Sequence, residues 1–415
     1  MSPRRVLLVC YYFPPLGMGG IGRPVNLFQE LPRLGWDCHV LTVKGVAYRG
    51  YERELAASLD QSRIHRAGSY DPQRLLYLLG VRQVGGTTIE RTRAASSRFF
   101  PDSKVGWVGP AVRLARKLCR EHTFDVVLTT SPPISSHLIG RQVAQEFNIP
   151  WVADFRDYWT VEPIEKAYHT ESFVRRGNDL LDRIRSGADA LTAVNHSIRS
   201  YLTKGDVIRN AYNEHQALAW VAPPSSDRYR IGLPGNQTVS ITWEPLLDAI
   251  ADARHISSAI DSRIELVQVG QIDPSAFRQE VERRSLKCRL SLHGQVSRTS
   301  FIEALNTTHL IYLGVPKIEG LQFIPGRIYD LLPSGRPILC NAPQESEIAE
   351  ILRPTGNALC FEETQIRTAV QYLADADARF RAGTLGITPR PAYATPYGSS
   401  TMAGQFANLF EQFIK

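Results

Sequence analysis

The sequence predicts an α/β protein with two Rossmann-like domains, each built on a parallel sheet and facing a shared cleft. Apolar runs of strand length alternate with helix-length segments through most of the chain. A stretch rich in Pro, Gly, Ser and Asn, Val221–Gln237, interrupts this alternation near the middle. At 415 residues the chain is too long for one ordinary core and about right for two domains.

The first half opens with a strand, a loop, a helix and a second strand. The first strand begins at Val6, a glycine-rich turn covers residues 17–22, and Pro24 opens a helix that ends at Gly35. Strand Asp37–Val43 follows. The same alternation then predicts helix Val112–Glu121, strand Asp125–Thr129, helix Ser135–Phe147, strand Trp151–Asp154, helix Glu171–Gly187 and strand Ala190–Val194.

The second half repeats the pattern after a linker at about 206–237. The expected elements are helix Glu244–Ser258, strand Ile264–Val269, helix Pro274–Ser285, strand Arg289–His293, helix Arg298–Asn306, strand His309–Leu313, helix Gly326–Leu332 and strand Pro337–Cys340. A Pro-rich stretch separates them from a last helix, Ser400–Ile414. We therefore expect a first domain over 1–205, a second over 206–390 and a terminal helical segment over 391–415.

Composition points to a cytoplasmic protein with an anionic partner. The net charge of +7 suggests nucleic acid, an acidic membrane or a phosphorylated small molecule. No apolar run approaches the roughly 20 residues that cross a bilayer. The short apolar stretch after Arg4 and Arg5 makes a poor signal peptide. Six separated cysteines without a C-x-x-C pair indicate reduced core residues rather than disulfides or metal ligands.

The glycine-rich turn, Gly17–Gly22, joins a strand to a helix. Backbone amides and a helix start suit a phosphate there. A plain tight turn and a dinucleotide fingerprint are the alternatives, since the glycines also fit G-x-G-x-x-G. The long loop before the glycines argues against the fingerprint, and so does a second strand that ends at Lys44 without an acid for a ribose.

A second anion-binding segment is predicted around Arg327. Gly326 and Arg327 begin a short helix, Asp330 lies one turn on, and Gly335 returns the chain to a strand. The guanidinium suits a diphosphate, and Asp330 is placed to accept hydrogen bonds from ribose hydroxyls. An ordinary helix closed by a glycine is the alternative.

Polar residues also follow the strand ends of the first domain. His137, Asp154 and Arg156 lie at or beyond the carboxyl ends of strands, where α/β proteins bind ligands. His137 suits positioning or deprotonating an acceptor hydroxyl, or a hydrogen bond to the transferred sugar. The alternatives are a histidine that faces solvent or core, and a structural ion-pair network around Asp154.

A basic region extends over Arg91–Arg120, where eight basic residues accompany one acid, Asp102. Phe99, Phe100 and Trp107 are interleaved with them. This pattern suits anionic lipid headgroups at the membrane surface. The alternatives are a solvated helix face and a nucleic-acid patch; no nucleic-acid recognition motif accompanies the region, so we expect no nucleic-acid partner.

Five segments, in order across nearly the whole chain, resemble glycosyltransferase family 4: Tyr11–Gly20, Ser131–Gly140, Pro150–Trp159, Val207–Asn213 and Gly326–Leu339. The resemblance implies a GT-B fold whose C-terminal domain binds most of the donor. It also implies a C-terminal helix that crosses back to the first domain. The reaction it implies is metal-independent, retaining sugar transfer.

The resemblance also assigns individual positions. Gly19 and Gly20 would contact the donor diphosphate, and Arg327 at the helix start after Gly326 would lie near the phosphates. Asp330 stands where the family usually has a ribose-binding glutamate. The remaining positions implied for the nucleotide pocket are Gly270 and Val296. The candidates for the chemistry come from the residues themselves: His137, Asp154 and Arg156 for their places at strand ends, and Glu319 as a nearby carboxylate.

Two departures from the family pattern bear on activity. Gln322 stands where the family often has a glutamate that contacts the sugar, and Glu319 lies close enough in sequence to replace it. The family also has a basic residue after the linker, but this chain has no Lys or Arg between Arg230 and Arg254. A missing phosphate-binding cation costs about 2–4 kcal/mol of leaving-group stabilisation.

The sequence therefore predicts a retaining, hexosyltransferase-like enzyme of polysaccharide biosynthesis. It would move a sugar from a nucleoside-diphosphate sugar to a glycan, lipid-linked or natural-product acceptor, with no metal or cofactor. Peripheral contact with the inner membrane face would run through Arg91–Arg120. The alternatives are a GT-B nucleotide-sugar epimerase, an inactive homologue acting as a partner subunit and, remotely, an NAD(P) oxidoreductase.

Overall fold

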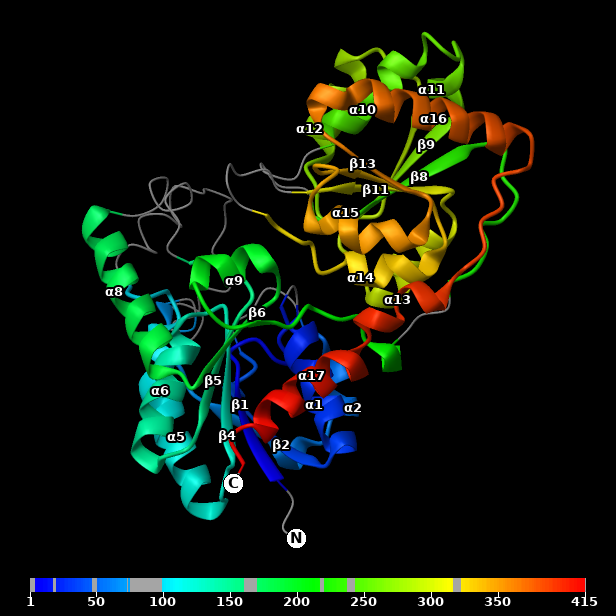
Figure 1. Cartoon of the computed structure of the whole chain (residues 1–415). Helices are drawn as coiled ribbons and strands as arrows, with labels where there is room; N and C mark the ends of the chain where they lie inside the picture. The colour runs from blue at the N-terminus through cyan, green and yellow to red at the C-terminus, as the bar shows by residue number, and fades with distance from the viewer. Residues whose placement is uncertain are drawn as a thin grey trace. The chain divides into compact units, whose positions relative to one another are not determined.

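The computed structural model describes residues 4–17, 20–46, 51–72, 74, 99–159, 170–216, 220–236, 243–315 and 322–414. The chain divides into two compact units. Unit 1 comprises Met1–Glu214 and Tyr397–Lys415, and unit 2 comprises His215–Pro396. Each unit holds one parallel sheet with helices on both faces (Figure 1).

The described part of unit 1 contains a seven-stranded parallel sheet in the order β3-β2-β1-β4-β5-β6-β7. Its strands are β1 (Arg4–Val9), β2 (Trp36–Val43), β3 (Ile64–Ala67), β4 (Val126–Ser131), β5 (Trp151–Phe155), β6 (Ala190–Ala193) and β7 (Asp206–Val207). The central strands are buried on both faces, which explains their continuous apolar runs. The strand order reverses between β1 and β4, and ligands bind at such a reversal in open α/β sheets.

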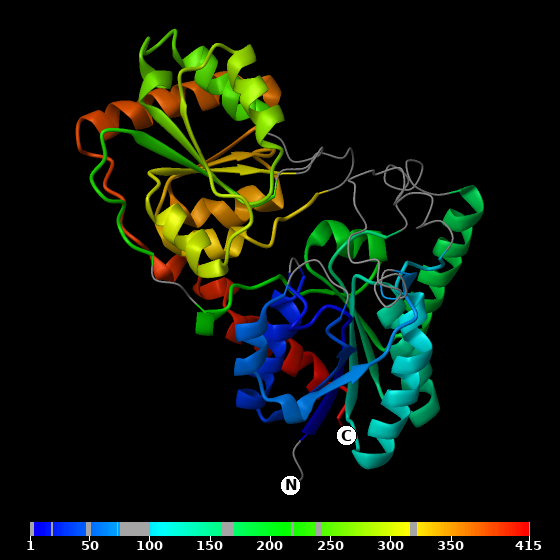
Figure 2. The ribbon, with the colours of Figure 1, turned by 180° about the vertical axis from the view of Figure 1, so that it is seen from behind.

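Helices on the two faces of this sheet form separate cores. The helices are α1 (Gly22–Glu30), α2 (Arg53–Ser58), α5 (Val108–Glu121), α6 (Ser135–Phe147), α8 (Glu171–Gly187), α9 (His196–Leu202) and α17 (Ser399–Glu411). Helices α5, α6 and α8 cover one face, while α1 and α17 cover the other (Figures 1 and 2).

The last helix, α17, packs against α1 and the sheet of unit 1. Its Met402, Phe406 and Phe410 are buried in one cluster with residues of β1, β2 and α1. The Phe410 ring meets the Trp36 ring edge-on, with centroids 5.1 Å apart. The expected return of the C-terminal helix to the first domain is confirmed.

The described part of unit 2 contains a six-stranded parallel sheet in the order β10-β9-β8-β11-β12-β13. Its strands are β8 (Tyr229–Pro234), β9 (Ile264–Val269), β10 (Arg289–Leu292), β11 (Leu310–Gly314), β12 (Ile338–Asn341) and β13 (Ala358–Phe361). The strand order reverses between β8 and β11. Two all-parallel sheets confirm the predicted pair of Rossmann-like domains.

Seven helices are described in unit 2: α10 (Glu244–Ala253), α11 (Ile260–Arg263), α12 (Pro274–Arg283), α13 (Arg298–Asn306), α14 (Ile328–Leu331), α15 (Glu347–Leu352) and α16 (Ile366–Arg381). Helix α10 ends at Ala253, five residues before its predicted end. Helix α16 was not predicted. No helix in the described ranges is long and apolar enough to cross a membrane.

The predicted linker contains a strand, so that expectation is wrong for residues 229–234. Strand β8 lies in the middle of the second sheet, although its Gly232 and Pro234 are typical of loops. A Cβ atom at Gly232 would meet the Leu305 side chain at 2.8 Å and the Thr308 side chain at 3.1 Å. Glycine is therefore required here by close packing rather than by a turn.

We predict that Phe410→Ala lowers the free energy of unfolding of unit 1 by about 3–5 kcal/mol, because the substitution leaves a cavity beside Trp36. Urea denaturation measures the change. Asn408→Ala, on the exposed side of α17, is the control and should change it by less than about 0.5 kcal/mol. Equal effects of the two substitutions would contradict this packing.

Candidate functional site

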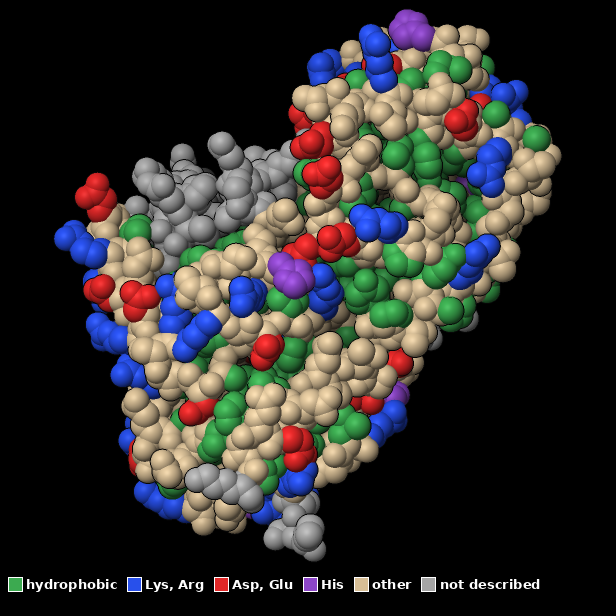
Figure 3. Space-filling model, in the orientation of Figure 1, with side chains coloured by type: hydrophobic (Ala, Val, Ile, Leu, Met, Phe, Trp, Pro, Cys, Tyr) green, Lys and Arg blue, Asp and Glu red, His purple; other side chains and the backbone are tan. Residues whose placement is uncertain are grey.

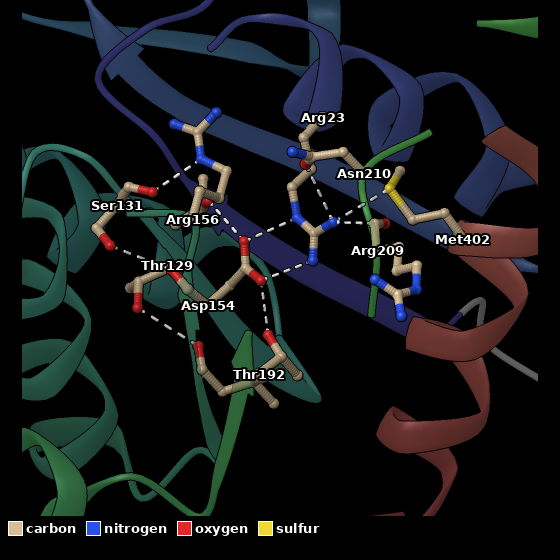
Figure 4. Close-up of polar contacts among 11 residues, drawn as sticks. Arg23, Thr129, Ser131, Asp154, Arg156, Thr192, Arg209, Asn210 and Met402 are labelled. Atoms are coloured by element: carbon tan, nitrogen blue, oxygen red, sulfur yellow. Dashed lines mark hydrogen bonds and ion pairs between the residues drawn. The ribbon is translucent and has the colours of Figure 1, made fainter. Parts of the chain in front are cut away.

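An ion pair is buried at the carboxyl ends of β4, β5 and β6 in unit 1 (Figure 4). The Arg23 guanidinium donates from Nη2 to Asp154 Oδ1 at 2.8 Å and from Nε to Oδ2 at 2.9 Å. The Arg23 side chain is 1% exposed and the Asp154 side chain 0% exposed. Two charges removed from water this completely require full hydrogen bonding to be tolerated.

The Asp154 carboxylate meets that requirement. The Thr192 hydroxyl donates to Oδ1 and the Thr130 hydroxyl to Oδ2, each at 2.7 Å. Burial alone would raise the pKa of Asp154, but the Arg23 charge and these hydrogen bonds outweigh it and hold the pKa below its ordinary value. Each carboxylate oxygen already accepts two bonds, so the geometry favours the structural network over the expected catalytic role for Asp154.

Arg23 also connects this pair to later parts of the chain. Its Nη1 donates to the Arg209 carbonyl at 2.9 Å, and it lies 3.5 Å from both Asn210 Oδ1 and Met402 Sδ. Its guanidinium carbon stands 5.1 Å above the Phe406 ring. Arg23 thus joins the start of α1 to the 209–210 loop and to α17. Sequence reasoning missed Arg23, although it directly follows the predicted glycine turn.

Arg156 holds that glycine turn. Its Nε donates to the Ser131 carbonyl at 2.8 Å and its Nη2 to the Pro132 carbonyl at 3.3 Å. Its Nη1 donates to the Gly20 carbonyl. Gly20 has φ +97°, a backbone conformation that favours glycine. The structure therefore brings the predicted residues Gly20 and Arg156 together, while Gly19 lies outside the described residues.

His137 is buried in the first turn of α6 and is 0% exposed. The Thr129 hydroxyl lies 2.7 Å from its Nδ1, accepts from the Trp151 indole at 2.8 Å and lies 3.4 Å from the Val152 carbonyl. The other ring nitrogen, Nε2, has no partner among the described residues. Burial lowers the pKa of His137 to about 3, so the ring is neutral. This burial favours the core alternative over the expected contact with an acceptor.

In unit 2 the Arg327 side chain reaches the carboxyl end of β8. Its Nη1 donates to the Pro234 carbonyl, and its guanidinium occupies the space that a Cβ atom at Gly235 would need. Gly235 has φ +93°. In the described part of the chain no carboxylate pairs with Arg327. Burial lowers the pKa of this guanidinium from its ordinary value.

Hydrogen bonds from backbone amides and from one side chain join neighbouring loops at this edge of the sheet. Gly235 N donates to the Val269 carbonyl at 2.6 Å, and Gln268 Nε2 donates to the Gly235 carbonyl at 2.8 Å. Gly270 N donates to the Gly294 carbonyl at 2.8 Å. Gly270 has φ +136°, and a Cβ atom there would collide with the Gly235 backbone. Arg327, Gly235 and the predicted Gly270 therefore form one site at the β8–β11 reversal.

The other predicted donor-binding residues lie around this site or beyond the described ranges. Val296 is half-buried and follows β10 at the same sheet edge. Gly326 and Gln322 are exposed and precede α14. Asp330 is half-buried in α14, and its carbonyl accepts from the Trp220 indole at 3.1 Å. Glu319 lies outside the described residues.

The position of Arg327 bears on the missing basic residue after the linker. No Lys or Arg occurs between β8 and Arg254, but the guanidinium of Arg327, in the segment after β11, reaches the carboxyl end of β8. A cation therefore lies at this strand end, although it comes from a later part of the sequence than the basic residue of the family pattern. Sequence reasoning predicted Arg327 but missed its neighbour Gly235.

No group of three or more His, Cys, Asp or Glu side chains in the described ranges is arranged to hold a metal ion.

Residues 19–211 match the family described as the glycosyl transferase 4-like domain. Unit 1 contains such a domain. No curated protein matches the sequence of the chain. The matched range includes β2–β7, the Gly20 turn, Arg23, Asp154 and Arg156, while β1 and α17 lie outside it.

Solved structures share the complete fold at low sequence identity. The Anabaena protein HepE, in complex with UDP and glucose, has a TM-score of 0.62 and 12% identity, with 99% of this chain and 100% of that chain covered. An α,α-trehalose-phosphate synthase from Burkholderia xenovorans, in complex with glucose-6-phosphate, has a TM-score of 0.60 and 12% identity, with 98% and 100% covered.

A putative UDP-N-acetylglucosamine 2-epimerase from Listeria monocytogenes is more distant. It has a TM-score of 0.52 and 10% identity, with 99% of this chain and 98% of that chain covered. These structures show that the chain has the GT-B fold. The domain match and this fold together support a glycosyltransferase.

We predict that Asp154→Asn lowers the free energy of unfolding by about 3–5 kcal/mol near neutral pH, because it leaves the buried Arg23 charge without its counter-charge. The folded-state pKa of Asp154 is depressed below the unfolded value of about 3.9. Its contribution is therefore present above that value and is lost as pH falls toward the folded-state pKa.

Denaturation over an acid pH series checks both statements. The variant should lose less stability in acid than the wild-type chain does. Asp206→Asn, which removes an exposed carboxylate from the same unit, is the matched control and should leave both curves nearly unchanged. An equal loss in the two variants would show that the ion pair does not stabilise unit 1.

Proposed function

We propose that the chain is a retaining, metal-independent glycosyltransferase that uses a nucleoside-diphosphate sugar as donor. The acceptor would be a glycan, a lipid-linked precursor or a natural product. The observation that carries the proposal is Arg327, a half-buried guanidinium at the β8–β11 reversal with no carboxylate partner among the described residues. An uncompensated cation in that position suits a phosphate ligand.

The fold shared with nucleotide-sugar complexes supports a diphosphate in particular. Gly235 and Gly270 adopt positive φ and pack against Arg327 and against each other, which holds the guanidinium at this strand end. Their own amides already donate to the Val269 and Gly294 carbonyls, so Arg327 is the proposed phosphate ligand here. HepE and the trehalose-phosphate synthase share this fold, and HepE is crystallised with UDP and with UDP-glucose. UDP-glucose is therefore the first donor to test.

The proposed chemistry depends on charge at the leaving group. When the bond between the anomeric carbon and the phosphate oxygen breaks, negative charge develops on the diphosphate. Arg327 would stabilise that charge more in the transition state than in the bound substrate, which lowers the barrier. Attack from the same face by an acceptor hydroxyl, whose proton passes to an oxygen of the departing diphosphate, then retains the configuration. This arrangement relies on electrostatics rather than on a strong base.

The remaining predicted residues have proposed roles around this centre. Asp330 would accept from the ribose hydroxyls. Gly326 and Val296 would line the nucleotide pocket, and Gln322 and Glu319 would contact the transferred sugar. In unit 1 the proposed role of Arg156 is positional, because its donors hold the Gly20 turn through backbone carbonyls. Gly19 and Gly20 would contact the diphosphate.

Membrane contact through Arg91–Arg120 belongs to the same proposal. Residues 91–98 lie outside the described ranges. On α5, Arg113 and Arg120 are exposed without a protein partner among the described residues, while Arg116 pairs with Glu146 at 2.7 Å and Lys117 with Glu121 at 3.7 Å. The exposed guanidiniums suit anionic headgroups at the inner face of a membrane.

A GT-B epimerase is the second candidate, favoured by the shared fold with the putative Listeria epimerase. An epimerase would convert one nucleotide-sugar into another without an acceptor. Product analysis separates the two functions, because only a transferase releases free nucleoside diphosphate as it forms a glycoside.

We predict that UDP-glucose or another nucleoside-diphosphate sugar raises the melting temperature of the chain. A ligand at about 100 times its dissociation constant adds about 2.7 kcal/mol to stability. Arg327→Ala should weaken binding of that donor about tenfold to hundredfold, because charge-assisted hydrogen bonds contribute about 1.5–3 kcal/mol. Isothermal titration measures the loss.

Arg367→Ala, which removes an exposed arginine from α16 of the same unit, is the matched control. Its donor affinity should equal that of the wild-type chain. If no nucleotide-sugar of the UDP, GDP, TDP or ADP series changes the melting temperature, the transferase proposal fails. Equal affinity of the Arg327→Ala and wild-type proteins would mean that the phosphates bind elsewhere.

We also predict that the glycoside formed keeps the anomeric configuration of the donor and that a chelator leaves the initial rate unchanged. Proton NMR of the isolated glycoside reads the configuration from the coupling between its H1 and H2 protons. An inverted product would exclude same-face attack. A rate abolished by chelator and restored by a divalent metal would exclude the metal-independent mechanism.

A further inference from the structure

A surface pocket of about 300 Å³ lies among the helices of unit 1, and its lining includes neither Asp154 nor Gly20 nor Arg156. It is formed by α6, α8 and the segment that precedes α5. Its lining includes Phe100, Leu138, Arg141, Arg176, Asp179 and Arg183. Its volume is at the small end of ligand sites in proteins.

Three of the lining side chains are arginines that have no counter-ion in the part of the chain that the structure describes. Among the described residues, Arg141, Arg176 and Arg183 make no ion pair and no side-chain hydrogen bond to the protein. A neighbour on the same helix behaves differently: Arg185 pairs with Asp182 at 2.9 Å and also donates to a backbone carbonyl. The pocket thus gathers guanidiniums whose N–H groups have no acceptor among the residues that the structure describes.

Arg141 gives a second, independent indication that the pocket binds a hydrogen-bond acceptor. Its Nε is buried from solvent and has no hydrogen-bond partner in the described part of the chain. A buried N–H group that lacks an acceptor destabilises the folded protein, so such groups are uncommon. A ligand oxygen in the pocket would satisfy this group.

Arg176 is held in a fixed orientation by Phe100. Its guanidinium carbon stands 4.1 Å above the centre of the Phe100 ring. Phe100 in turn meets the Phe173 ring edge-on, with centroids 5.4 Å apart. Stacking over a ring uses the face of the guanidinium and leaves the N–H groups at its edge free to bind an oxyanion.

The charge and the polar groups of the pocket indicate the class of ligand. Three arginines and one carboxylate, Asp179, give a formal charge of +2. Figure 3 shows Lys and Arg side chains along the α8 side of unit 1. A phosphate suits the arginines, and Asp179 suits a neighbouring hydroxyl as hydrogen-bond donor. Leu138 and Phe100 add apolar surface.

We propose that this pocket binds a phosphate ester that carries a free hydroxyl, at a site separate from the donor site of unit 2. A glycerophosphate group has this chemistry. It occurs as a free metabolite and as the headgroup of an anionic lipid. The proposal does not depend on sugar transfer, so the two can fail separately.

The test uses the full chain and two probes. Titration with sn-glycerol 3-phosphate detects the soluble ester, and co-sedimentation with equimolar phosphatidylglycerol and phosphatidylcholine vesicles detects the headgroup. Removing two charge-assisted contacts in Arg176→Gln/Arg183→Gln should weaken binding about tenfold or more. The matched control, Arg175→Gln/Arg199→Gln, removes two exposed arginines outside both the pocket lining and the Arg91–Arg120 region, and it should bind within about twofold of the wild-type chain.

The outcomes separate the two sources. Binding of the soluble ester supports a metabolite site, and binding of vesicles alone supports a lipid headgroup. Arg327→Ala should leave either signal unchanged. Failure of both probes to bind overturns the proposal. So does an equal loss in the pocket variant and the control variant, because that result means general charge attraction without a site. Melting curves of each variant confirm that the proteins are folded.

Discussion

The Arg23–Asp154 ion pair is the constraint on which unit 1 depends. Both charges are removed from water, so they are tolerated only because each carboxylate oxygen accepts two hydrogen bonds. These bonds fix the ends of β4, β5 and β6 relative to the start of α1. The turn that Arg156 holds through Gly20 lies directly before that helix. The shape of this sheet edge therefore follows from one satisfied pair of charges.

Each unit has an arginine packed against a glycine near a strand end, but the two arginines make different contacts. In each unit the strand order reverses beside the first strand, which is β1 in unit 1 and β8 in unit 2, and a glycine with positive φ follows that strand. The Arg156 guanidinium lies against Gly20, and the Arg327 guanidinium lies against Gly235. Arg156 donates to three backbone carbonyls, which makes it a structural clamp. Arg327 donates to one backbone carbonyl among the described residues.

The alternation of strands and helices was predictable because parallel strands are apolar along their whole length. Strand β8 escaped prediction because Gly232 and Pro234 are typical of loops, and the reason for Gly232 lies in contacts with residues more than seventy positions away. The strand-end positions of Asp154 and His137 were predictable from spacing. Their burial was not, because it depends on packing between distant segments: Arg23 meets Asp154 across 131 positions.

The placement of α17 has a consequence for synthesis of the chain. Unit 2 is inserted, in sequence, between Glu214 and Tyr397 of unit 1. A ribosome must therefore complete all of unit 2 before the residues that cover β1 and α1 emerge. Until then, the apolar surface later covered by Phe406 and Phe410 remains open to water and to chaperones. Unit 1 is therefore synthesised first, but its core is completed last.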